Sequence, residues 1–415
     1  MVQSEQLSPD PVGLKSNDSL PLACATPLRI RVRLLIDQHL LRQTPGALDS
    51  LALVLGEREP LHDVSAQEYA AITVGNCGAN SEEGAKMIVR NQAVMQALVS
   101  CMSNAHDVRM QETAVVALKN CAASSQEAAL GISQSDQTMA LLKSFVLQTT
   151  HERLRDVAVG AINSISRSPA AVPKLKTTGV HSAMLQEMLS VEDSRPSGGT
   201  SDLRTLTAAC AVINIEASQP ELHLLQPWLK SAAGKRAIHN MVRCLGFALR
   251  GEQWKCVSFS PHSVICPLYN LTRCFALDDL SIDGVKVVQY IVQLIRECQR
   301  FSRWKDNLSV SIKILDNLAL SAAFQALVRG QCIQLMQSIA STNSTHTSFW
   351  FPPHPSPEDQ VCIQRIKVQA QKMAKALLAL PLAVCMGQHA RLGQSSVLLA
   401  VDEAILQMVV VYALY

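Results

Sequence analysis

The feature that most constrains this sequence is an asparagine that recurs at the end of successive apolar, helix-like stretches. Six residues occupy this position: Asn76, Asn120, Asn163, Asn214, Asn270 and Asn317. The intervals between them are 44, 43, 51, 56 and 47 residues. Periods of this size are typical of stacked helical units that bury their apolar faces against one another. The spacing therefore predicts one elongated solenoid rather than several globular domains.

A second recurring position holds residues that favour tight turns. After each asparagine comes a short apolar stretch and then one of six such residues: Asn91, Asp136, Gly179, Gly234, Gly284 or Gly330. A tight turn between two helices needs a residue that tolerates positive φ, which glycine does best. Another apolar run follows each of them. We therefore expect a unit of helix, turn, helix, loop and a third helix that ends in asparagine.

This three-helix unit resembles the armadillo repeat, which joins a short first helix, a glycine turn, an apolar second helix and a long third helix ending in asparagine. The segments that match best are SEEGAKMIVRNQAVMQALVSCM, followed by VRMQETAVVALKNCA, and SPAAVPKLKTTGVHSAMLQEML. The resemblance covers roughly residues 29–380, and residues 29–80 read as a first repeat with Gly46 at its turn. It implies an all-α, right-handed α-solenoid superhelix of about seven three-helix repeats.

Composition agrees with one helical-repeat domain. Hydrophobic residues make up 48% of the chain and aromatic residues only 4%, which suits helices packed through aliphatic side chains. A solenoid grows by adding interfaces between neighbours, so 415 residues do not require separate cores. We expect a flexible leader over residues 1–27 and helical repeats over 28–415. Segments rich in Ser, Thr, Gly and Pro predict inserted loops near 192–202 and 341–360.

The second of these loops carries Phe349, Trp350 and Phe351 next to two prolines. The aromatic residues either form a docking segment for a partner or fold back onto the helices of the chain itself. The same loop contains His346 and His354, but two histidines without further ligands do not predict a metal site.

The thirteen cysteines predict neither disulfides nor a metal site. Their number is odd, they are scattered, and no C-x-x-C pair occurs. Most lie in apolar helical runs, where a free thiol behaves as a small hydrophobic side chain. We therefore expect reduced core cysteines. A redox-sensitive thiol in the tract of Cys256, Cys266 and Cys274 is the alternative.

The absence of targeting or membrane segments and the low net charge argue against membranes and nucleic acids as partners, and RNA binding by the concave surface stays an alternative. The chain has no secretory signal and no apolar run of about 20 residues that could span a bilayer, which predicts a cytoplasmic and/or nuclear protein with no membrane partner. The net charge is only +3, and Arg29, Arg31 and Arg33 form the densest basic patch. Because phosphate neutralisation requires clustered Lys and Arg, we do not expect nucleic acid as a partner.

The sequence carries no local signature of catalysis. The P-loop, the dinucleotide-binding glycine pattern, the nucleophile elbow and the helical zinc motif do not occur in it. We therefore expect no enzyme activity, no cofactor and no metal. An enzyme whose site residues are dispersed along the chain remains an alternative, because such a site leaves no local pattern.

The asparagines are the candidate partner-binding residues. If their helices line a concave groove, the amides repeat at the spacing of packed helices, and each can both donate to and accept from a peptide unit. Peptide-binding members of the armadillo family use their asparagines in this way, and the resemblance implies the same role for the six here. The other interpretation is that the amides satisfy backbone groups at helix ends or between repeats.

One departure from the family narrows the class of partner. Members that bind basic nuclear-import signals have a tryptophan four residues before each asparagine, where this sequence has Ile72, Val116, Val159, Cys210, Cys266 and Lys313. We therefore expect a non-catalytic scaffold or adaptor that binds a protein or an extended peptide other than such a signal. The alternative is a regulatory or oligomerising segment of a larger protein. The apolar ending AILQMVVVYALY favours it, because terminal repeats normally present a polar face.

Overall fold

The computed structural model describes most of the chain between Thr44 and Arg391. The described residues are 44, 46–56, 64–79, 81–104, 106–190, 201–216, 225–255, 257–275, 282–301, 303–342, 350–351 and 356–391. They form α-helices, short 3₁₀ helices and one two-stranded antiparallel ribbon, which confirms the expected all-α class. The leader over residues 1–27 and residues 192–200 of the first expected loop lie outside this part.

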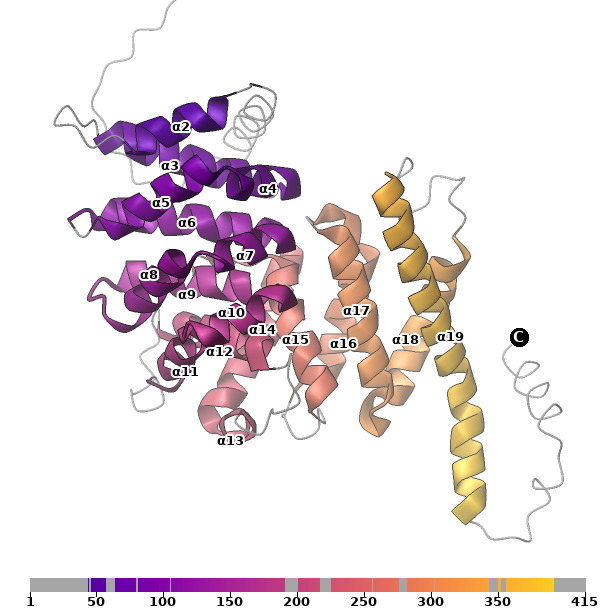
Figure 1. Cartoon of the computed structure of the whole chain (residues 1–415). Coiled ribbons are helices and arrows are strands. Elements are labelled where there is room, and N and C mark those ends of the chain that lie inside the picture. Colours follow the sequence, from indigo (N-terminus) through magenta and orange to yellow (C-terminus); the bar gives the residue numbers. More distant parts are fainter. Residues whose placement is uncertain are drawn as a thin grey trace, which may run out of the picture.

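A pair and two triplets of helices open the described chain. The pair is α2 (Ala47–Gly56) and α3 (Val64–Gly78). The first triplet is α4 (Glu82–Arg90), α5 (Gln92–Ser103) and α6 (Val108–Ser124). The second is α7 (Gln126–Ser133), α8 (Asp136–Leu147) and α9 (Glu152–Ser166). In Figure 1 these helices lie across the view in a stack that begins with α2.

The later groups are less regular. One comprises η1 (Pro169–Ala171), α10 (Val172–Thr177), α11 (Val180–Ser190) and α12 (Ser201–Glu216). The next comprises α13 (Gln226–Lys230), α14 (Ala232–Arg250), strands β1 (Gln253–Trp254) and β2 (Val257–Ser258), and α15 (Pro261–Cys274). The last elements are α16 (Gly284–Arg296), η4 (Cys298–Arg300), α17 (Trp304–Ala319), α18 (Ala322–Ser341) and α19 (Pro357–Arg391). Helices α16 to α19 stand more steeply beside the stack (Figure 1).

Short polar side chains determine where many helices begin. Ser81, Ser125, Ser135 and Ser231 are N-caps whose hydroxyl oxygen accepts a hydrogen bond from the backbone N–H three residues later. The carboxylate of Asp107 does the same at the start of α6. Each cap satisfies one of the N–H groups that have no partner within the first helical turn. The boundaries of these helices are therefore encoded locally.

The asparagine-bearing helices pack against one another in sequence order. Helix α3 contacts α6, α6 contacts α9, and the row continues through α12, α15 and α17 to α19. Helices α2, α5, α8 and α11 form a second row. Buried side chains along the chain, from Leu48 in α2 to Leu377 in α19, belong to one hydrophobic core. Because each helix packs mainly on its neighbours, the core extends along the chain rather than around one centre.

The turn prediction is correct at Gly179 and Asn91, which each lie between two helices, but of the six positions only Gly179 has a positive φ. Gly179 has a φ of 73° between α10 and α11, and Gly46 before α2 has a φ of 77°. Asn91 instead has a φ of −81°, and its side chain accepts a hydrogen bond from the N–H of Val94 at the start of α5. The other four lie within helices: Asp136 in α8, Gly234 in α14, Gly284 in α16 and Gly330 in α18. The expectation of a positive φ is wrong at these positions, because an N-cap residue starts the helix just before them or the helix continues through them.

The expected turn inside the last unit is absent from the described chain. Only Leu320 and Ser321 separate α17 from α18, and α18 is one helix of 20 residues with no separate short first helix. Gly330 does not interrupt it, and a Cβ at this exposed position would meet no atom within 4 Å. The three-helix pattern is therefore replaced here by two long helices, α18 and α19.

Two aromatic residues of the second expected loop fold back onto the helices. Trp350 and Phe351 are 8% and 4% exposed. The Nε1 atom of Trp350 donates a hydrogen bond to Ser338 Oγ at 3.0 Å, and the ring of Phe351 lies 6.3 Å from that of Trp304. Of the two interpretations of this loop, folding back is correct for both residues. Phe349, His346 and His354 lie outside the described residues.

Candidate functional site

The six predicted asparagines lie in the last two turns of neighbouring helices. They are Asn76 in α3, Asn120 in α6, Asn163 in α9, Asn214 in α12, Asn270 in α15 and Asn317 in α17. Since these helices pack in sequence order, the side chains follow one another from helix to helix. The structure thus brings the predicted residues into one row.

Four of these amides link one helix to the helix before it in the row. Each donates from Nδ2: Asn120 to the carbonyl of Gly75 at 3.3 Å, Asn214 to Ser166 Oγ at 3.3 Å, Asn270 to Asn214 Oδ1 at 3.1 Å, and Asn317 to Thr272 Oγ1 at 3.1 Å. An amide has two N–H donors and a carbonyl acceptor, so one such bond leaves further capacity. The hydrogen bonds between helices therefore still leave these amides groups that could bind a ligand.

Burial differs along the row. Asn163 and Asn214 are only 8% and 5% exposed, and the Oδ1 atom of Asn163 is buried without a partner among the described residues. Asn76, Asn120, Asn270 and Asn317 are partly exposed. A partner could reach the amides near both ends of the row more easily than those in the middle. Partner binding by the six amides stays a prediction.

The end of the row opens into a groove between α15, α17 and α19. The groove has a volume of about 860 Å³, and its lining includes Tyr269, Lys313, Asp316, Asn317, Val361 and Val368. Both valines are exposed, at 54% and 41%. Sequence analysis identified Asn317 here but not the α19 side of the groove, because the exposed valines of a long helix carry no distinctive local pattern.

Charges of both signs line this groove. The Nζ atom of Lys313 lies 5.8 Å from the centroid of the Tyr269 ring, and the guanidinium carbon of Arg273 lies 5.7 Å from the same centroid. Both cations therefore lie close enough to interact with this ring. Partial burial raises the pKa of Asp316, which lines the groove together with Lys313. The surface is amphipathic and of mixed charge.

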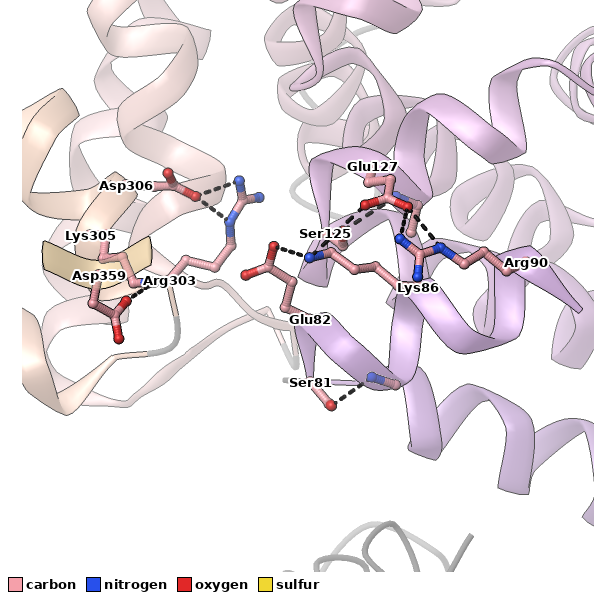
Figure 2. A network of polar contacts seen from close by, with 12 residues as sticks. Ser81, Glu82, Lys86, Arg90, Ser125, Glu127, Arg303, Lys305, Asp306 and Asp359 are labelled. Carbon is pink, nitrogen blue, oxygen red and sulfur yellow. Dashed lines mark hydrogen bonds and ion pairs between the residues drawn. The ribbon is translucent and has the colours of Figure 1, made fainter. Parts of the chain in front are cut away.

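A second polar region joins parts of the chain that are far apart in sequence. Arg303, the residue before α17, donates from Nη1 to the carbonyl oxygen of Ala123 at the end of α6, at 3.3 Å. Its Nε and Nη2 atoms also contact Asp306 at 2.9 and 2.7 Å. Figure 2 shows Arg303 and Asp306 facing the helices that carry Lys86 and Glu127. The residue before α17 therefore reaches the end of α6, 180 residues away in sequence.

Ion pairs flank this junction on both sides. Lys86 contacts Glu82 at 3.0 Å and Glu127 at 4.0 Å, and Arg90 Nη2 lies 2.6 Å from Glu127 (Figure 2). On the other side, Lys305 pairs with Asp359 at the start of α19. The pKa of Lys86 is raised, with its hydrogen bond to Glu82 as the largest cause. These pairs are partly exposed, so each contributes little stability by itself.

His262, Cys266 and Asn307 form a hydrogen-bonded chain beside the junction. Cys266 Sγ lies 3.3 Å from His262 Nε2, and His262 Nδ1 lies 3.2 Å from Asn307 Oδ1. Burial raises the pKa of Cys266 to about 11, and burial together with nearby arginines holds the pKa of His262 well below 6.5. The pair therefore consists of a protonated thiol and a neutral imidazole, which gives no support to a nucleophilic thiolate.

The other described cysteines are free and mostly buried. Burial raises the pKa of Cys121 to about 12 and that of Cys101 to about 11. Cys256, in the tract considered for redox sensitivity, lies outside the described residues. Within the described part, no cluster of His, Cys, Asp and Glu could hold a metal ion. Among the helices of that part, none combines the length and apolar character needed to cross a bilayer.

Comparison with known proteins does not assign a family. No protein-family model matches the chain, and no curated protein matches it. One similar solved structure comes from work on a conserved phosphorylation switch that controls the interaction between cadherin and β-catenin. That chain is 12% identical, and the match covers 86% of this chain and 69% of that one with a TM-score of 0.31. A likeness of this size assigns neither a family nor a function to this chain.

Proposed function

We propose that this chain is a non-catalytic protein-interaction scaffold or adaptor that binds an extended segment of a partner protein along a concave groove. In this proposal the helices form a right-handed superhelix of about seven armadillo-like units, and the protein acts in the cytoplasm and/or the nucleus. The observation that carries the proposal is the open groove of about 860 Å³ between α15, α17 and α19.

The lining of the groove suits an extended peptide. Asn317 uses one N–H to bind Thr272, which leaves the second N–H and the carbonyl oxygen for the backbone of a partner. Successive side chains of an extended peptide point to opposite faces, so every second one can face the groove. Val361 and Val368 offer exposed apolar surface for these side chains. The lining holds three basic residues, Lys313, Arg365 and Lys372, and one carboxylate, Asp316. We therefore propose a partner segment of alternating apolar and polar residues whose charged positions are acidic rather than basic.

The amides are proposed to have two roles. Asn76, Asn120, Asn270 and Asn317 are partly exposed and are the proposed contacts to the partner. The two buried amides of the middle of the row are proposed to act between helices, since Asn214 both donates to Ser166 and accepts from Asn270. This assignment combines both interpretations of the sequence pattern.

The groove is tested by substituting its exposed apolar residues. A displayed library of random peptides is selected on the purified chain, and the selected peptides are then titrated against Val361→Glu/Val368→Glu. We expect at least a tenfold loss of affinity, because two charged groups replace the apolar contact surface. Leu53→Glu is the matched control, since Leu53 is 73% exposed on α2, away from the groove. Equal affinity in all three proteins would remove the groove as the binding site.

A second pair of variants separates partner binding by Asn317 from its hydrogen bond to Thr272. Asn317→Ala removes the amide, whereas Thr272→Val removes only the hydroxyl that this amide binds. If Asn317 holds the partner, Asn317→Ala weakens peptide binding and Thr272→Val does not. If the amide acts only between helices, both variants lower stability to a similar extent and neither changes the affinity of the folded protein.

A further inference from the structure

Arg167 is a buried arginine without a counter-ion in the described chain. It directly follows the last residue of α9, and only 7% of it is exposed. Neither its Nε nor its Nη1 atom has a hydrogen-bond partner among the described residues. Burial, with a contribution from nearby Arg303, lowers the pKa of Arg167 to about 10. The guanidinium therefore remains charged at neutral pH.

The groups that act on Arg167 do not neutralise it. Its pKa is shifted by Arg303 and by the thiols of Cys210 and Cys266, and none of these is a carboxylate. Burial raises the pKa of both thiols, so they stay protonated at neutral pH. The nearby carboxylate of Asp306 is already paired with Arg303. None of these groups therefore supplies a counter-charge to Arg167.

Lys119 adds another cation to this region. Burial and the charge of Arg167 both lower the pKa of Lys119. Its side chain lies over Gly160, with Cδ 3.4 Å from the position of a Cβ there. Gly160 and Arg167 are seven residues apart, two helical turns, so both lie on the same side of the α9 axis. The ammonium group of Lys119 has no ion pair or hydrogen bond among the described residues.

The start of α17 adds N–H donors rather than a net charge, because Arg303 is paired with Asp306 in the first turn of this helix. Arg303 is the N-cap of this 16-residue helix and makes no side-chain cap to it. It has a φ of 59° and a ψ of 37°, a left-handed conformation that costs a non-glycine residue energy and persists only where surrounding contacts enforce it. The enforcing contacts are the carbonyl of Ala123 and the carboxylate of Asp306. The N–H groups and dipole of a helix N-terminus favour anions.

The cations of Arg167 and Lys119 repel each other, and an unpaired buried charge is strongly unfavourable. We propose that Arg167, Lys119 and the Arg303 end of α17 bind one small tetrahedral oxyanion, phosphate. Guanidinium, ammonium and helix N-terminal N–H groups together suit an ion with several acceptor oxygens. Arg167 and neighbouring His262 are both more than nine-tenths buried, which suits a small ion rather than a peptide backbone.

The proposed ion has a structural consequence. It lies between α6 and α9 of the stack and the start of α17, where Arg303 already contacts Ala123. Its binding holds α17 against the stack and fixes how strongly the chain curves. This inference does not depend on the proposed partner groove, because the residues involved do not line it.

The test uses the full chain exchanged into phosphate-free chloride buffer. Sodium phosphate, sodium sulfate or glycerol phosphate is titrated at constant ionic strength, with thermal unfolding and isothermal titration calorimetry as readouts. We expect phosphate to raise the unfolding temperature in a saturable way beyond the effect of chloride, because a ligand that binds only the folded state stabilises it. Tighter binding of glycerol phosphate would identify a phosphate ester as the source of the ion, and tighter binding of inorganic phosphate would identify the free ion.

Arg167→Met is the decisive variant. We expect its phosphate affinity to fall at least tenfold, and its unfolding temperature without phosphate to equal or exceed that of the wild type, since an unpaired buried charge is removed. Arg155→Met, on the same helix but bonded to the Thr149 carbonyl, is the matched control that keeps the phosphate response. If Arg167→Met does not fold, Lys119→Met takes its place. Phosphate acting no more strongly than chloride, or undiminished phosphate affinity in Arg167→Met, would overturn the proposal.

Discussion

Replacing Gly84 by alanine probes the closest contact between successive helices at the start of the stack. A Cβ at this position would lie 2.2 Å from the carbonyl oxygen of Cys77 and 3.0 Å from Ser81 Oγ. Carbon and oxygen normally stay about 3.3 Å apart, so α4 and the end of α3 would have to separate by roughly 1 Å. The Cys77 oxygen is a backbone atom, so a side-chain rotation cannot relieve the closer of the two contacts.

The size of the effect follows from two opposing contributions. Alanine in place of a helical glycine stabilises by about 0.5–1 kcal/mol, whereas overpacking a tight contact destabilises by about 1–3 kcal/mol. The shift also strains the cap in which Ser81 Oγ accepts from the N–H of Gly84 at 3.0 Å. We therefore expect Gly84→Ala to destabilise the α3–α4 region by roughly 1–2 kcal/mol, a factor of about 5–30 in the local opening equilibrium.

Gly330→Ala is the matched control. The chemical change is identical, but the site is exposed inside α18 and no atom lies within 4 Å of the new Cβ. This variant should be stabilised by about 0.5–1 kcal/mol, the difference in helix propensity alone. Hydrogen exchange read by mass spectrometry is the suitable assay, because elongated repeat proteins can open locally. If the α3–α4 peptides of Gly84→Ala exchange no faster than those of the wild type, the inferred contact is not rigid and the reasoning fails.

Two further predictions concern titratable groups. Burial, Arg303 and Arg167 hold the pKa of His262 well below 6.5, so below that pH the unfolded chain binds a proton that the folded chain does not, and stability falls by up to about 1.4 kcal/mol per pH unit. Urea denaturation between pH 7.5 and 5 should show a weaker pH dependence for His262→Gln than for the wild type or for the exposed control His106→Gln. An equal slope in all three would contradict this assignment. Burial also raises the pKa of Cys121 to about 12, so native protein at pH 8 should leave Cys121 unalkylated by iodoacetamide while the partly exposed Cys274 reacts, and urea should make both reactive. Rapid labelling of Cys121 in the native protein, read by peptide mass spectrometry, would contradict the buried position of α6.

Local patterns were sufficient to predict the helical class and the positions of the asparagine row. The apolar runs and the Ser and Asp caps act within a few residues, so they can be recognised without knowledge of the fold. The turns were less predictable. Gly234 and Gly330 look the same in sequence as Gly179, but they lie within helices, because a serine cap before α14 and the uninterrupted α18 make a left-handed residue unnecessary.

By itself, the sequence determined an all-helical chain with equivalent amides near the ends of neighbouring helices. The tertiary structure decided which of those amides are buried, how Trp350 packs against α18, and how the start of α17 comes to lie beside the end of α6. The hydrogen bond from Arg303 to Ala123 spans 180 residues. Its formation depends on the sum of small rotations between successive helices, and no local pattern records that sum. The unpaired charge of Arg167 and the α19 side of the groove arise in the same way, from segments that meet only once the chain has curved.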